Sequence, residues 1–96
     1  MFKTIADVRQ ANKDAGHYFF ERQTMNFFGS RIESSLYAGQ YFITSEEGLY
    51  ESDPRRYTIR MARPDGSVQN ASDYRQFAGI EAARKVARAS ARLIRA

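Results

Sequence analysis

The stretch "YTIRMARPDGSVQNA", residues 57–71, contains a strand, a tight turn and a returning strand in one short run. Apolar and polar side chains alternate along its first half, as they do in a β-strand that packs one face on a core. Pro64 fixes φ and Gly66 tolerates a positive φ, so "RPDGS" predicts a turn. Because so short a connection cannot make a parallel crossover, the stretch predicts an antiparallel hairpin.

Two more strand patterns precede this hairpin. "RIESSLY" (31–37) alternates apolar and polar side chains, and "YFITS" (41–45) is rich in residues that favour strands. A turn around Gly39 separates them, and a polar loop with Gly48 and Pro54 follows. The sequence therefore predicts an antiparallel meander of three to four strands.

Helix signals surround these strands. Thr4 and Asp7 form a capping-box pattern at the start of a first helix, which Gly16 should end. "HYFF" (17–20) is interpreted as a brief strand or an extended link. "ERQTMNFF" predicts a second, short helix that ends at Gly29, and a last helix should run from Ile80 to about Ile94.

The fold class that follows is α+β: a small antiparallel meander sheet of three to four strands packed with N-terminal helices and a C-terminal helix. A chain of 96 residues has room for one modest core, so we expect a single domain over residues 1–96. We expect the helices to cover one face of the sheet.

Composition excludes several function classes. The chain has no cysteine, which rules out disulfides and thiolate chemistry. No apolar run approaches the roughly 18 residues of a membrane span, and "MFKTIADVRQ" lacks the apolar stretch of a signal peptide. These features predict a soluble, cytoplasmic protein with no membrane partner.

Catalytic and metal-binding patterns are missing from the sequence. His17 is the single histidine, and no nucleophile, orienting carboxylate or set of further ligands accompanies it in a recognisable motif. The glycines form neither a GxxxxGK[ST] nor a GxGxxG pattern. We therefore expect no enzyme activity, no catalytic residue, no metal and no cofactor.

Six aromatic rings gather in residues 16–37. Such rings can stack bases, bind a protein partner or fill a core. Because the chain has no tryptophan, phenylalanine and tyrosine must supply most of the large core side chains. We predict that the following side chains are mainly core: Phe20, Phe27, Phe28, Phe42 and Ile59. The tyrosines, with their polar tips, are expected nearer the surface.

The last predicted helix has two contrasting faces. A stripe of mostly small residues should pack on the sheet: Ile80, Ala83, Ala87, Ser90 and Ile94. A neighbouring basic stripe is the candidate partner-binding surface: Arg84, Lys85, Arg88, Arg92 and Arg95. The alternative interpretation of this stripe is a solvated face, since cations suit a helix C-terminus. The protein's net charge of +4 is concentrated here.

Four segments carry a resemblance to a known family: "VRQANKDAGHYFF", "TMNFFGSR", "YFITSE" and "PRRYTIR". Together they resemble a family of small uncharacterised proteins encoded by bacteriophages and other mobile elements. That family brings no activity and no site residues. The resemblance implies a protein that acts in the cytoplasm of a bacterial host, where small phage proteins, anti-CRISPR inhibitors among them, bind host machinery.

The leading hypothesis is a non-enzymatic binding protein that inhibits or redirects a host complex by occlusion, with an anti-CRISPR inhibitor as the specific case. Its partner would be a host protein or a ribonucleoprotein complex. The alternative is a small basic nucleic-acid-binding protein that uses the basic stripe on phosphates. A phage structural or accessory protein is a third possibility, and the sequence leaves the oligomeric state open.

Overall fold

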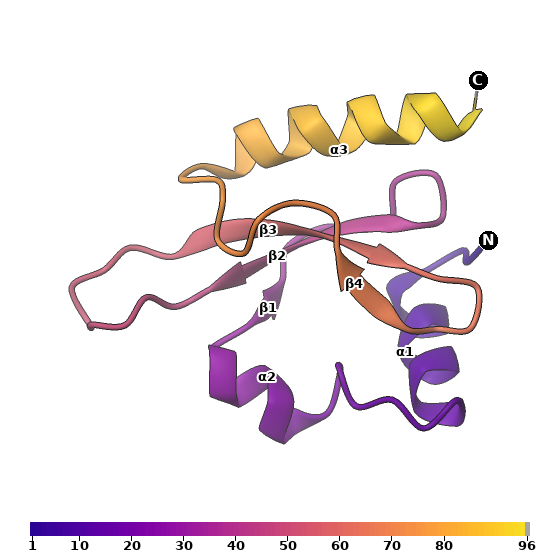
Figure 1. The fold of residues 1–96 in the computed structure, drawn as a ribbon, viewed down its shortest axis with the longest axis horizontal. Helices are drawn as coiled ribbons and strands as arrows, with labels where there is room; N and C mark the ends of the chain where they lie inside the picture. Colours follow the sequence, from indigo (N-terminus) through magenta and orange to yellow (C-terminus); the bar gives the residue numbers. More distant parts are fainter. Residues whose placement is uncertain (96) are drawn as a thin grey trace.

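The computed structural model describes residues 1–95 and shows a four-stranded antiparallel sheet with three helices (Figure 1). The strands lie in the sheet in their order along the chain, β1-β2-β3-β4. The elements are α1 (Ile5–Asp14), α2 (Arg22–Phe28), β1 (Arg31–Ile32), β2 (Tyr41–Glu46), β3 (Arg56–Ala62), β4 (Val68–Asn70) and α3 (Ile80–Arg95). The predicted α+β meander is therefore confirmed.

The three helix boundaries predicted from local signals are confirmed: α1 ends at Asp14, just before Gly16 with its φ of 83°, and the other two lie at Thr4 and Gly29. The Thr4 hydroxyl accepts a hydrogen bond from the Asp7 N–H at 3.2 Å, and the Asp7 carboxylate accepts one from the Thr4 N–H at 3.2 Å. This reciprocal pair satisfies two N–H groups that would otherwise lack partners. Gly29 ends α2 with a φ of 60°, in the left-handed region that glycine adopts without strain.

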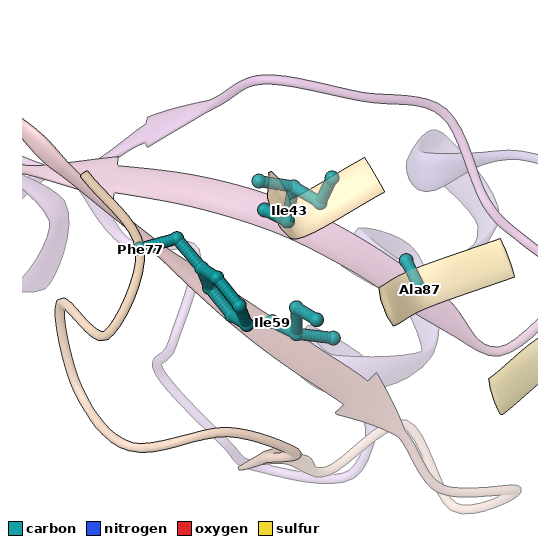
Figure 2. Packing of buried hydrophobic residues seen from close by; sticks show 5 residues of the cluster. Ile43, Ile59, Phe77 and Ala87 are labelled. Carbon is teal, nitrogen blue, oxygen red and sulfur yellow. The ribbon is translucent and has the colours of Figure 1, made fainter. Parts of the chain in front are cut away.

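One face of the sheet packs against α3 and holds the main apolar cluster (Figure 2). We call it the α3 face. Its strand residues include Ile43 and Ile59, and Phe77 closes one end. Ala83 and Ala87 of α3 are fully buried against them, because their short side chains let the helix approach the strands closely.

The opposite face, here called the pocket face, is also covered, so the expectation that helices cover only one face is wrong. Figure 1 shows α3 on one side of the sheet and α1 and α2 on the other. Phe42 on this face is fully buried, and its ring lies 6.1 Å from that of Phe20 and 6.2 Å from that of Phe19. Every residue of β2 after Tyr41 is buried, the pattern of a strand enclosed on both faces.

Several local predictions fail in detail. Residues 17–20 form a link and a turn, with no strand. The strand expected over 31–37 shortens to β1, and beyond it only a single bridge joins Tyr37 to Tyr41. In α3, Ile94 is exposed and Ala91 is buried in its place, because the buried line repeats every four residues from Ala83. Within residues 1–95, no helix is both long and apolar enough to cross a membrane.

Candidate functional site

The Arg60 side chain lies buried on the pocket face, between β2 and β4. Its Nε donates a hydrogen bond to the Thr44 hydroxyl at 3.0 Å, and its Nη1 donates to the Asn70 side-chain oxygen. Its Nη2 donates to the Glu46 carboxylate at 2.9 Å. Only 8% of Arg60 and none of Glu46 is exposed, so this is an enclosed ion pair.

Glu46 has further donors around its carboxylate. The Thr58 hydroxyl donates to Oε1 at 2.7 Å, and the Ser30 hydroxyl donates to Oε2 at 3.1 Å. Removing two charges from water is costly unless each is paired and its remaining hydrogen-bonding atoms are satisfied. The two hydroxyls and Arg60 together meet that requirement for the carboxylate.

Two aromatic rings lie over the Arg60 guanidinium. Its central carbon is 5.2 Å from the centre of the Phe19 ring and 5.8 Å from that of Tyr74, both within the range of a cation–π contact. The loop after β4 positions Tyr74. The next residue, Arg75, has a φ of 56°, and its N–H donates to the Thr58 hydroxyl at 2.8 Å. A non-glycine residue in this conformation is strained, and such strain is typical of binding loops.

These groups enclose a cavity of about 270 Å³, which we call the Arg60 pocket. Its walls are apolar side chains: Phe19, Met25, Phe28 and Tyr74. Arg60 and three polar side chains complete the lining: Thr24, Ser30 and Asn70. A mostly apolar cavity with a few convergent polar groups is the usual form of a ligand site.

An exposed apolar surface adjoins this pocket; we call it the aromatic patch, and it consists of Phe27, Phe28, Leu49 and Tyr74. These four side chains, together with Glu47, Gly48 and Arg75, line a hollow of about 610 Å³. Phe27 is 81% exposed, Leu49 is 93% exposed, and Phe28 and Tyr74 are each 44% exposed. The prediction that Phe27 and Phe28 belong to the core is therefore wrong, whereas Phe42 and Ile59 are core and Phe20 is half-buried.

Three more arginines hold the loops around the patch by donating to backbone carbonyls. Arg55 Nη2 donates to the Ser45 oxygen at 2.8 Å, and Arg56 Nε donates to the Arg75 oxygen at 2.7 Å. Arg75 Nη2 donates to the Pro54 oxygen at 2.9 Å. Much of the positive charge in this region thus serves internal contacts.

The predicted basic stripe lies elsewhere, on α3. Arg84 is paired with Glu81, and Lys85, Arg88 and Arg92 are exposed. The side chain of Arg95 lies outside the residues whose side chains are described. Because α3 covers the α3 face and the Arg60 pocket opens on the pocket face, the structure does not bring the stripe and the aromatic patch together.

His17 lies near one carboxylate. Its Nε2 is 3.8 Å from the Asp65 carboxylate, and the imidazole is 39% exposed. Among residues 1–95, no group of three histidine, cysteine, aspartate or glutamate side chains could hold a metal ion.

The Tyr74 hydroxyl should titrate at unusually high pH. Partial burial, with a further contribution from the Glu46 charge, raises the pKa of Tyr74 above its ordinary value of 10.0. The folded protein therefore holds this proton to a higher pH than the unfolded chain does. The stability that the neutral Tyr74 hydroxyl contributes is fully present below pH 10 and is lost as the pH rises through the raised pKa.

We expect urea denaturation to show a steeper loss of stability between about pH 9 and about pH 11 in the wild type than in Tyr74→Phe. An ultraviolet difference titration of the two proteins should give a Tyr74 midpoint above that of a free tyrosine. A midpoint at or below the ordinary value would contradict the partial burial of the Tyr74 hydroxyl.

The fold and the pocket define a small α+β protein whose sheet encloses an arginine–glutamate pair beneath an aromatic cavity. The chain belongs to a family of unknown function, DUF7447, which it matches over residues 4–88. This agrees with the resemblance to an uncharacterised family. No match was found among curated proteins or among solved structures.

Proposed function

We propose that this chain is a non-enzymatic binding protein that docks the aromatic patch on a macromolecular partner and acts by covering that partner's surface. The observation that carries the proposal is the grouping of four large apolar side chains around one hollow. A small domain gains stability by burying such side chains, and contiguous exposed ones mark interaction surfaces. Aromatic residues are also the usual energetic centres of protein interfaces.

Binding of nucleic acid is the second candidate function, and the exposed Lys85, Arg88 and Arg92 favour it. A single-strand platform combines stacking rings with a basic groove along the backbone. Here the rings lie on the pocket face and the cations on α3, so one strand would not engage both at once. The stripe would then bind phosphates alone, with affinity that falls steeply as salt rises.

The resemblance to phage and mobile-element proteins points to a partner in the bacterial cytoplasm. A host protein or ribonucleoprotein complex is the proposed target, and a CRISPR effector is one such complex. The protein would then act as an inhibitor of host defence, by occlusion rather than by chemistry.

Affinity capture from a bacterial lysate tests this proposal. The patch variant Phe27→Ser/Leu49→Ser should remain folded, because both side chains are almost fully exposed. The matched control is Arg88→Gln/Arg92→Gln on α3. We expect the patch variant to retain about one tenth or less of the partner that the wild type captures, and the control to retain it in full.

A different pattern would favour the second candidate. If capture is lost in the α3 control, is abolished by nuclease and falls with salt, the basic stripe is the binding surface and the aromatic patch is not.

A further inference from the structure

The size of the Arg60 pocket limits what it can hold. Its volume of about 270 Å³ lies just below the range of roughly 300–1,000 Å³ usual for drug-sized ligands. The walls of Phe19, Phe28 and Tyr74 offer aromatic surfaces that a flat ring can contact. The pocket thus suits one substituted ring.

The charge around the pocket favours a neutral ligand. The positive charge of Arg60 is already balanced by Glu46 at 2.9 Å, and among residues 1–95 no acidic side chain lines the cavity. An anionic ligand would lose its hydration without finding an unpaired cation in the pocket. A cationic ligand would be repelled by the Arg60 guanidinium and would find no accessible carboxylate to pair with. A neutral ring avoids both costs.

The polar lining supplies hydrogen-bond donors. A guanidinium has five N–H protons. The contacts within residues 1–95 use one proton each on Nε, Nη1 and Nη2 of Arg60, which leaves one on each Nη. The Thr24 hydroxyl and the Asn70 amide add further donors at the cavity. A ligand with a carbonyl-type acceptor at its edge complements this set.

We propose that the Arg60 pocket binds a small molecule with a single, neutral, planar ring that carries a hydrogen-bond acceptor at its edge. This goes beyond the proposed function, since it needs no macromolecular partner. Because Phe27 and Leu49 do not line the pocket, failure of this proposal would leave the capture experiment and its outcome unaffected.

Three probes of nearly equal shape test the proposal: benzamide, benzoate and benzylamine. Each is titrated into the ¹⁵N-labelled protein, and the signals of the Asn70 amide and the Arg60 Nε–H are followed. We expect benzamide to bind with a Kd on the order of 1 mM, as a ligand of so few atoms allows. Benzoate and benzylamine should bind about fivefold or more weakly, because each must lose the hydration of a charge.

Two variants complete the design. Tyr74→Ala removes one wall of the pocket and should weaken benzamide binding about fivefold or more. Tyr50→Ala removes an exposed tyrosine outside the pocket and should leave it unchanged. Equal or tighter binding of either charged probe would overturn the neutral-ring assignment. Absence of any shift at Asn70 and Arg60 with millimolar benzamide would overturn the site itself.

Discussion

Replacing Phe42 with alanine should lower the free energy of unfolding by about 3–5 kcal/mol. The ring is fully buried in the middle of β2 and contacts the rings of Phe19 and Phe20 on the pocket face. Its removal leaves a cavity that the surrounding backbone of β2 and β3 cannot close. Because domains are stable by only about 5–15 kcal/mol, the variant should be close to unfolding.

Urea denaturation followed by circular dichroism measures this loss. Phe27→Ala is the matched control, since it deletes the same ring where 81% of the side chain is exposed, and it should change stability by less than about 1 kcal/mol. Similar losses in the two variants would show that the pocket face is not packed around Phe42.

The parts of the fold that follow from short-range chemistry could be predicted. The turn at Gly66 and the alternation along β3 specify a hairpin, and the Thr4–Asp7 pair and Gly29 specify two helix ends. Each of these signals acts within a few residues, so no knowledge of distant packing was needed. Part of the buried alanine line of α3 could also be predicted from the sequence, because residues three to four positions apart lie on the same face of a helix.

Which aromatic rings are buried could not be predicted. Composition shows that rings must fill the core, but it does not identify them. The link and turn at residues 17–20 direct Phe19 and Phe20 toward Phe42, whereas the short helix α2 buries neither of its own phenylalanines. The burial of Phe42 by Phe19 and Phe20 depends on contacts between residues more than twenty positions apart in the sequence. Phe27 and Phe28 lie outside these contacts and form part of the aromatic patch.

The candidate pocket was hidden for a related reason. In the alternating pattern of β3, Arg60 and Thr58 lie on the face opposite Ile59. Because both side chains are polar, the sequence suggests that this face is exposed to solvent. Only the pairing register shows that Arg60 lies beside Thr44 and Glu46, with Tyr74 from a later loop above it. The sequence signal for the pocket was a polar side chain on each of two neighbouring strands. The same pattern occurs on a sheet face that is simply exposed to solvent, so it did not identify a pocket.

The second large effect is expected from Arg60→Met, which should cost about 3–5 kcal/mol of stability. Methionine fills much of the same space but provides no charge and no donors. The fully buried Glu46 carboxylate would lose its counter-charge and keep only the hydroxyl hydrogen bonds from Thr58 and Ser30. The midpoint of urea denaturation should therefore fall sharply, with a smaller change for Arg63→Met on the exposed turn.

The double variant Arg60→Met/Glu46→Gln separates the loss of charge balance from the loss of packing. Glutamine keeps an oxygen that can accept from Thr58 and removes the unbalanced negative charge, so the double variant should be more stable than Arg60→Met alone. The coupling between the two sites should reach about 1–3 kcal/mol, as for other residues in direct contact. The comparison also requires the single variant Glu46→Gln. If the losses of the two single variants simply add in the double variant, Arg60 and Glu46 do not stabilise each other across their 2.9 Å contact.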